Sequence, residues 1–380
     1  MKYRKFGKLD FQVSALGFGA MRLPVLDKDQ NRINEPEAVK MIHYAFDHGV
    51  NYIDTAYPYH GGTSEGVVGR ALKGYRDKVR LATKLAVWAV QTAQDFDRLL
   101  NEQLGKLQTE HIDFYLLHGL NKGRWPFLVD LDVFGWAEKA IQDGRIGHLG
   151  FSFHDDLEVF KKIVDAYDRW TLCQIQYNFM DIEYQAGTEG LRYAADKGLA
   201  VVVMEPIRGG QLARVPPPDI AAIWDAAPTK RSPAEWALQW VWNQPEVSVA
   251  LSGMSAMRHV TENVASAERS GVGSLTPEES ALIDQVREQF KTRSAIPCTA
   301  CRYCMPCPNN VNIPGIFGLY NDAIIYDDLR RARMLYRIRI PEAERAELCQ
   351  ACQDCEELCP QALPISEWMG KCRELLEQAP

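Results

Sequence analysis

Four polar side chains stand where short apolar stretches of the chain end. Asp54, Lys84 and His118 each close a stretch rich in Val, Ile and Leu, and Tyr59 follows Asp54 by five residues. A tyrosine phenol is a weak acid at neutral pH, but a nearby ammonium stabilises its phenolate. Lys84, held in place by Asp54, would lower the pKa of Tyr59. Tyr59 would then protonate a carbonyl oxygen as hydride reaches the carbon, and neutral His118 would orient the carbonyl.

A purely structural interpretation of these residues is also open. Asp54 and Lys84 would then form a buried ion pair, and His118 would be an ordinary core histidine. Tyr57 competes with Tyr59 for the acid role, although its spacing from Asp54 fits less well. Among the aromatic residues that follow these stretches, Trp88 and Trp125 suit either a pocket wall or the core, and His154 suits either a pocket or solvent.

Eight short apolar runs, lacking strict alternation, predict strands buried on both faces. They are 15–20, 50–54, 79–85, 112–118, 146–151, 171–177, 199–204 and 247–251. Eight strand–helix units in about 290 residues fit a (β/α)8 TIM barrel, an α/β fold whose active sites lie at the carboxyl ends of the strands. An open doubly wound sheet is less favoured, because Gly17-Phe-Gly19 lacks the third glycine of its cofactor-binding turn.

Helical periodicity fills the gaps between these runs. The predicted helices are 38–48, 96–107, 133–142, 157–166 and 189–197, and glycines 49, 144 and 198 mark helix ends. The residues before Gly7 and the segment 9–13 predict a hairpin that plugs the amino-terminal end of the barrel. We expect 119–130 and the proline-rich segment 215–228 to be loops above the opposite end.

With these residues in place, the first 290 residues resemble the aldo-keto reductase family. The resemblance includes Gly17-Phe-Gly-Ala-Met-Arg22, Gly150-Phe-Ser152, Gln174-Ile-Gln-Tyr-Asn178 and Glu262-Asn263. It implies a small carbonyl or alcohol substrate and an NAD(P)(H) cofactor whose carboxamide Gln174 holds beside Ser152. The implied cofactor contacts are Gly19, Met21, Asp54, Ser152, Gln174, Met204, Pro206, Arg208, Gly253, Arg258, His259, Glu262 and Asn263.

Some positions depart from the family pattern. Met204 stands where an aromatic residue usually stacks on the nicotinamide. Gly253 and His259 stand where NADP-using members carry a Lys and an Arg that clamp the 2′-phosphate, so NADH and NADPH both stay open. Arg258 and Arg208 would be the substitutes, although a phosphate clamp needs a well-placed fork.

Eight of the ten cysteines form two runs near the carboxyl end. The first is Cys298-x2-Cys301-x2-Cys304-x2-Cys307-Pro, and the second is Cys349-x2-Cys352-x2-Cys355-x3-Cys359-Pro. The second matches the bacterial ferredoxin run fully, and the first is one residue short in its last gap. Two 4Fe-4S clusters are therefore predicted. Zinc is the alternative, although structural zinc sites normally use paired C-x2-C knuckles.

Resemblance to two-cluster ferredoxins implies that the fourth cysteine of each run binds the other cluster. One cluster would then take Cys298, Cys301, Cys304 and Cys359, and the other Cys349, Cys352, Cys355 and Cys307. The spacer, 308–348, shows helical patterns at 314–323 and 326–336, which predict a helical ferredoxin-like domain. Cys173 and Cys372 are expected to be packing residues.

Composition and charge limit the class of protein. The chain has 380 residues and a net charge of −7, without the basic face of a nucleic-acid binder. It also lacks a stretch that would span a membrane and an apolar leader, so a cytoplasmic location is expected.

The whole chain resembles a subgroup of aldo-keto reductases with a carboxyl-terminal 4Fe-4S ferredoxin-type domain. We expect a reductase-like barrel at 1–290 and the iron–sulfur domain at 291–380. The clusters would be structural or exchange electrons with a redox partner protein. The alternative function is an electron-transfer or docking module in which the barrel has become a scaffold.

Overall fold

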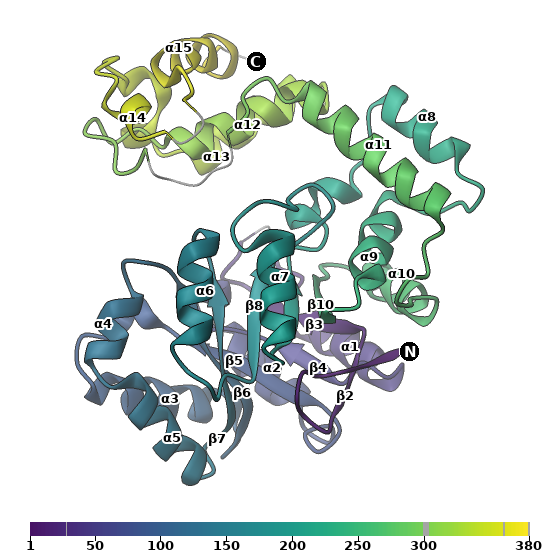
Figure 1. Ribbon diagram of the computed structural model, residues 1–380, viewed down its shortest axis with the longest axis vertical. Coiled ribbons are helices and arrows are strands. Elements are labelled where there is room, and N and C mark those ends of the chain that lie inside the picture. Colours follow the sequence, from purple (N-terminus) through teal and green to yellow (C-terminus); the bar gives the residue numbers. More distant parts are fainter. Residues whose placement is uncertain (28, 299–303, 360–361, 379–380) are drawn as a thin grey trace. The chain divides into compact units, whose positions relative to one another are not determined.

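The computed structural model describes residues 1–27, 29–298, 304–359 and 362–378. The chain divides into two compact units. The first comprises Met1–Ala213 and Ala234–Thr276, and the second comprises Arg214–Pro233 and Pro277–Pro380. Figure 1 labels the elements of both units. The candidate residues Asp54, Tyr59, Lys84 and His118 all lie in the first unit.

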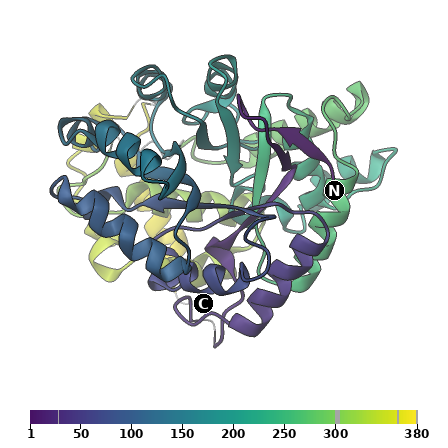
Figure 2. The same cartoon turned by 90° about the horizontal axis from the view of Figure 1, so that it is seen from below.

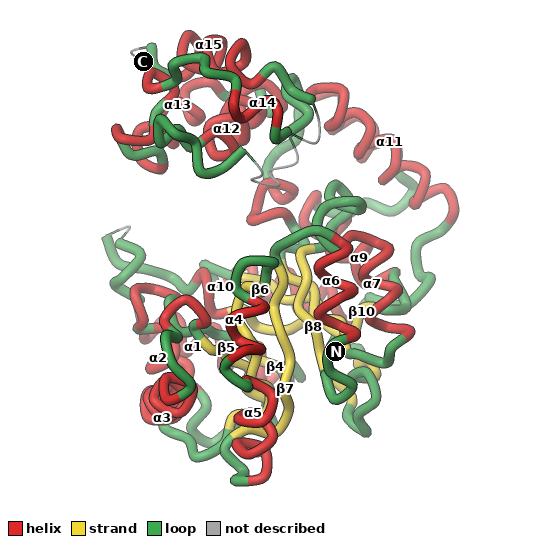
Figure 3. The backbone as a smooth tube through the Cα atoms, turned by 60° about the vertical axis from the view of Figure 1, so that its left-hand side comes forward, coloured by secondary structure: helices red, strands yellow, loops and turns green. Residues whose placement is uncertain are grey.

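The first unit is a closed barrel of parallel strands, as the sequence predicts. The strands pair in the order β10-β3-β4-β5-β6-β7-β8-β9, so that β10 meets β3 and closes the ring. Figure 3 shows them in yellow. Their bounds are β3 (Leu16–Gly19), β4 (Tyr52–Asp54), β5 (Arg80–Leu85), β6 (Ile112–Leu120), β7 (Ile146–Phe153), β8 (Leu172–Gln176), β9 (Ala200–Met204) and β10 (Val247–Gly253).

A hairpin of β1 (Tyr3–Lys5) and β2 (Gln12–Ser14) precedes the barrel, purple in Figures 1 and 2. Phe6 in its turn packs on Tyr52 and Phe114, with ring centroids 5.9 and 4.6 Å apart. These partners belong to the amino-terminal halves of β4 and β6. The hairpin therefore plugs that end of the barrel, as predicted, and leaves the carboxyl ends of the strands for chemistry.

The helices of this unit bury one apolar face against the strands, and several end at a glycine of positive φ, such as Gly49 and Gly198. The five predicted helices are all present, with bounds shifted by at most a few residues. The bounds are α1 (Glu35–Asp47), α2 (Ser64–Ala71), α3 (Gln94–Leu107), α4 (Trp125–Asp130), α5 (Val133–Gln142), α6 (Leu157–Asp165), α7 (Gly187–Asp196), α9 (Pro233–Asn243) and α10 (Met257–Glu268).

Two segments expected to be loops contain helices instead. Helix α4 begins inside 119–130, and α8 (Pro218–Ala226) occupies most of 215–228. Each has a proline in its first turn, where the missing N–H would have no helical partner anyway. A proline in the first turn is compatible with a helix, and the expectation that both segments are loops was wrong.

The second unit is helical and has its own core. It contains α8, α11 (Pro277–Arg293), α12 (Ile313–Ile325), α13 (Leu329–Arg339), α14 (Asp354–Glu357) and α15 (Ile365–Leu376). The helices predicted in the cysteine spacer are α12 and α13. The expected domain boundary at residue 290 falls inside α11. Arg293 at the end of α11 forms an ion pair with Asp219 of α8 at 2.6 Å. The helices α8 and α11 therefore belong to this unit.

Within the part of the chain that the structure describes, no helix is long and apolar enough to cross a bilayer.

Candidate active site

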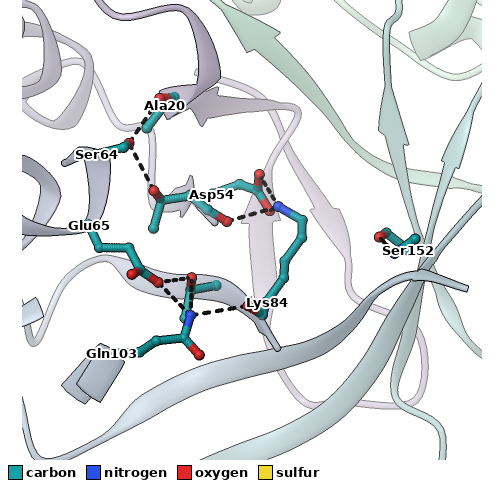
Figure 4. Close-up of polar contacts among 10 residues, drawn as sticks. Ala20, Asp54, Ser64, Glu65, Lys84, Gln103 and Ser152 are labelled. Atoms are coloured by element: carbon teal, nitrogen blue, oxygen red, sulfur yellow. Dashed lines mark hydrogen bonds and ion pairs between the residues drawn. The ribbon is translucent and has the colours of Figure 1, made fainter. Parts of the chain in front are cut away.

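A buried ion pair lies at the carboxyl ends of two neighbouring barrel strands. Lys84 Nζ donates to Asp54 Oδ1 at 2.6 Å, to Oδ2 at 2.8 Å and to the Thr55 carbonyl at 2.9 Å (Figure 4). Lys84 and Asp54 are 1% and 2% exposed. Because β4 and β5 are adjacent and parallel, the barrel itself brings these two side chains together.

Tyr59 and His118 lie beside this pair. Tyr59 begins the short 3-10 helix η2 (Tyr59–Gly62), and the Lys84 ammonium lies 5.1 Å from its ring centroid. The ring of His118, on β6, meets the Tyr59 ring edge-on with centroids 6.1 Å apart. The structure thus gathers all four residues that the sequence selected. Tyr57, by contrast, directs its hydroxyl to Glu102 at 3.4 Å.

Burial and pairing set the charges of this group. Burial raises the pKa of Tyr59, while the charge of Lys84 and its hydrogen bond to the phenol act in the opposite direction. The expected lowering by Lys84 is thus present but is outweighed. Burial opposes the charge of Lys84, yet Asp54 and Tyr59 raise its pKa overall. Burial and Lys84 together hold the pKa of His118 well below its usual value. At neutral pH, Tyr59 is therefore a protonated donor beside a charged lysine and a neutral imidazole.

A second buried network of hydrogen bonds connects β5 to the helices α2 and α3. It was not predicted from the sequence. Glu65 on α2 accepts from Thr83 at 2.7 Å and from Gln103 on α3 at 2.5 Å. The Gln103 amide also donates to the Lys84 carbonyl at 3.1 Å and accepts from the Tyr115 hydroxyl at 2.6 Å. Figure 4 shows Glu65 and Gln103 meeting next to Lys84. Gln103 belongs to a helix whose pattern showed only amphipathicity, and Glu65 belongs to α2, which was not predicted from the sequence.

A cavity of about 580 Å³ opens beside Tyr59 and His118. Trp88 is 45% exposed and forms part of its wall, whereas Trp125 packs on Trp170 in the core. Sequence reasoning did not select several of the lining residues, because loop side chains carry no periodic signal. The cavity is lined by Met21, Gln30, Pro58, Tyr59, His60, Val87, Trp88, His118, Gly119, Asn121, Arg124 and His154.

Ser152 and Gln174 are register partners on β7 and β8. The Ser152 hydroxyl oxygen accepts from the Gly119 N–H at 2.7 Å, so its own proton stays available. Burial raises the pKa of Asp54, and the charge of Lys84, its hydrogen bond and a hydrogen bond from Gln174 act in the opposite direction. Gln174 Oε1 is buried and has no hydrogen-bond partner among the described residues. The site therefore offers one donor and one orphaned acceptor side by side, a pair that fits a primary carboxamide.

The remaining predicted cofactor residues lie at the ends of β3, β9 and β10 and on α10. The guanidinium of Arg208 pairs with Asp181 at 3.4 Å. Asn263 is buried and donates to Ser252 at 3.0 Å. Arg258 is exposed on the first turn of α10. Burial is the main cause that lowers the pKa of His259, and the charge of Arg258 lowers it as well. Beside them stand Gly19, Met21, Met204, Pro206, Gly253 and Glu262.

Seven of the eight predicted cluster ligands are described, and Cys301 lies outside the described residues. Cysteines of both runs pack on the core of the second unit. The pKa of Cys355 is raised to about 11, chiefly by burial and in smaller part by Cys307 and Cys349. Cys307 of the first run therefore lies close to the second run. No group of three ligands for a single metal ion exists among the described residues.

Comparisons with known proteins agree with this geometry. The sequence model of the Aldo/keto reductase family matches residues 15–288. L-galactose dehydrogenase of Arabidopsis thaliana is 27% identical over 285 residues, which cover 70% of this chain and 88% of that protein.

Solved structures also match. The aldo-keto reductase AKR11C1 from Bacillus halodurans superposes with a TM-score of 0.63 at 29% identity, covering 75% of this chain and 96% of that one. An aldo-keto reductase from Klebsiella pneumoniae in complex with NADPH gives 0.61 at 26% identity, covering 75% and 95%.

Proposed function

The chain belongs to the aldo/keto reductase family, and we propose that Tyr59 protonates a carbonyl oxygen in the NAD(P)H-dependent reduction of a small carbonyl substrate. The same site would oxidise the corresponding alcohol in the reverse direction. The observation that carries the proposal is that Tyr59 and His118 line one cavity while the ion pair of Lys84 and Asp54 lies beside Tyr59.

Each residue of this group has a distinct task in the proposal. A bound nicotinamide supplies the hydride that reaches the carbonyl carbon. Tyr59 gives its phenol proton to the carbonyl oxygen, and Lys84 stabilises the phenolate that remains. Asp54 keeps Lys84 charged and in place. Neutral His118 has an unpartnered Nδ1, and its ring stands where it would hydrogen-bond and orient the carbonyl.

Ser152 and Gln174 would hold the nicotinamide carboxamide, the serine by donating and the glutamine by accepting. The residues at the ends of β9 and β10 and on α10 would contact the rest of the cofactor. Arg208 is engaged by Asp181, which leaves Arg258 and His259 as the side chains near a 2′-phosphate. The Klebsiella relative binds NADPH, but the departures here leave NADH as a second candidate.

The proposal is tested by steady-state oxidation of NADPH and NADH with a panel of aldehydes and ketones. Tyr59→Phe removes the proton and should lower kcat by about 10²–10⁴-fold while nucleotide affinity, measured by fluorescence quenching, stays unchanged. Tyr57→Phe is the matched control on the same loop and should keep wild-type turnover. Wild-type turnover in Tyr59→Phe would disprove the role of this residue.

For the second unit, we propose two 4Fe-4S clusters and hence membership of the ferredoxin-type subgroup. When bound, such clusters supply one-electron redox centres. The proximity of Cys307 to Cys349 and Cys355 supports the exchanged ligand set of Cys307, Cys349, Cys352 and Cys355. The other set would be Cys298, Cys301, Cys304 and Cys359. Four ligands of a cubane stand at separate corners, so they need not converge as ligands of one ion do.

The clusters would either stabilise residues 291–380 as a helical ferredoxin-like domain or exchange electrons with a redox partner protein. An anaerobic visible-absorbance titration with NADH and NADPH separates these roles. Bleaching of the cluster band would indicate electronic connection between nucleotide and clusters. An unchanged band would indicate a structural role or another electron donor.

A further inference from the structure

We propose that the substrate is a carbonyl compound that also carries an anionic group, such as a carboxylate, and that Arg124 binds this group. The inference rests on the proposed function and deepens it, because it names the substrate class of the same cavity. Arg124 follows β6 and begins the loop-to-helix turn of α4.

The formal charge on the cavity wall is positive. Among the lining residues there is one arginine, Arg124, with no lysine and no carboxylate. The guanidinium makes no ion pair or hydrogen bond with the described residues, although arginines elsewhere on the barrel, such as Arg145 and Arg208, pair with aspartates. An arginine fork matches the two oxygens of a carboxylate. A cavity of this kind attracts an anion and repels a cation.

The loop that carries Arg124 is fixed by its own hydrogen bonds. Asn121 Oδ1 accepts from the N–H groups of Gly123 and Arg124, each at 3.0 Å. The Lys122 N–H donates to Asp155 at 2.6 Å. The backbone beneath Arg124 is thus set before substrate arrives, and the Asn121 amide nitrogen stays available as a second donor on the cavity wall.

The two histidines of the cavity do not compete for this role. Burial lowers the pKa of both His118 and His154, so both imidazoles are neutral at physiological pH. Arg124 consequently carries the permanent positive charge of the wall, apart from the paired Lys84 beneath Tyr59.

The position of Arg124 also separates it from the proposed cofactor contacts. Most of those contacts stand on β7, β8, β9, β10 and α10, with others at the ends of β3 and β4. Arg124 follows β6, on the part of the barrel from which most of the proposed cofactor contacts are absent, and the same cavity wall includes Trp88, which follows β5. The anion that it meets therefore belongs to the substrate rather than to the cofactor phosphates.

The test compares two matched aldehydes, 4-carboxybenzaldehyde and its methyl ester, methyl 4-formylbenzoate. For the wild type, kcat/KM should favour the acid by roughly 10–100-fold, the range of a hydrogen bond to a charged group. Arg124→Gln should abolish this preference, because KM rises for the acid by much more than for the ester. Lys122→Gln, an exposed cation on the same loop that does not line the cavity, should keep the wild-type preference.

Failures of the two proposals are distinguishable. Equal reduction of acid and ester by the wild type would overturn the role of Arg124 and leave the reductase assignment intact. If neither aldehyde is reduced, calorimetric titration with benzoate tests the anion site without turnover. Binding that Arg124→Gln loses would support the inference, and absence of binding to the wild type would overturn it.

Discussion

At the scale of single residues, the site depends on two buried charges, those of Lys84 and Asp54. Burial would neutralise either charge if its partner were absent. Lys84 is almost fully buried and keeps its ammonium because Asp54 holds it with two hydrogen bonds. Burial of a lone charge is costly, so neither residue of the pair is tolerated without the other. The pair is thus both a stabilising feature and the electrostatic support of Tyr59.

Replacement of Lys84 tests both roles. Lys84→Met leaves Asp54 buried and unpaired, which should lower the free energy of unfolding by about 3–5 kcal/mol and abolish turnover. Lys106→Met is the control, because Lys106 pairs with Glu102 on an exposed helix face, where such a pair contributes only about 0.3–0.5 kcal/mol. Urea denaturation measures both changes, and equal effects of the two variants would contradict the account.

The neutral state of His118 predicts a pH dependence of stability. Its pKa is lowered in the folded protein, so below about pH 6.5 the unfolded chain binds a proton that the folded chain does not. Stability should therefore fall as pH falls from 7.5 to 5.5. His118→Gln removes this contribution and should lose about 1 kcal/mol less than the wild type over that range. Parallel losses in urea denaturation would show that His118 titrates normally.

At the scale of elements, the barrel places the site residues and the helices fix the strands. Asp54, Lys84 and His118 lie toward the carboxyl ends of three neighbouring strands, while Gln103 and Glu65 tie α3 and α2 to β5. Helices α2 and α3 must therefore pack closely. Gly69 on α2 permits this, because a Cβ there would lie 2.6 Å from the Leu107 carbonyl carbon.

A pair of glycine substitutions tests this contact. Gly69→Ala should destabilise the barrel by about 1–3 kcal/mol through overpacking. Gly105→Ala on α3 meets nothing within 4 Å and should instead stabilise it by about 0.5–1 kcal/mol, because alanine favours the helix. Thermal unfolding measures both. Stabilisation by Gly69→Ala would show that α2 and α3 are not in backbone contact.

The elements also show what sequence can and cannot predict. The strands were predictable because apolar runs buried on both faces leave a composition signal. The four proposed catalytic residues were selected because they lie at the ends of these strands or just after them. Helix α8 was missed because a proline that begins a helix looks the same as one that breaks it, and α4 was missed because it is a short helix within a long connection. Arg124, Asn121 and Gln103 were missed because a loop contact or a buried amide depends on tertiary packing and leaves no periodic pattern.

At the scale of the whole molecule, the chain combines a hydride-transfer barrel with a helical unit that carries the cysteine runs. Hydride transfer moves two electrons together, whereas a 4Fe-4S cluster moves one at a time. The two chemistries therefore need not be coupled. The cysteine spacing alone predicted the clusters, but how the two runs share ligands depends on the fold of the second unit.

Metal analysis of cysteine variants tests both the clusters and their ligand sets. Anaerobically purified wild type should contain about eight iron and eight sulfide per chain, as two four-iron clusters require. The double variant Cys307→Ser/Cys355→Ser should keep about four iron atoms if both cysteines bind the same cluster. Loss of nearly all iron would indicate that each run binds its own cluster, and zinc without sulfide would refute the clusters altogether.

The most direct test of the central claim follows the hydride itself. NADPH carrying deuterium at the transferred position is mixed with 4-carboxybenzaldehyde and wild-type protein, and the alcohol is analysed by mass spectrometry. The account predicts one deuterium in each alcohol molecule formed, and almost no alcohol from Tyr59→Phe even though that variant binds NADPH. Oxidation of NADPH without deuterated alcohol, or transfer by Tyr59→Phe at the wild-type rate, would contradict it.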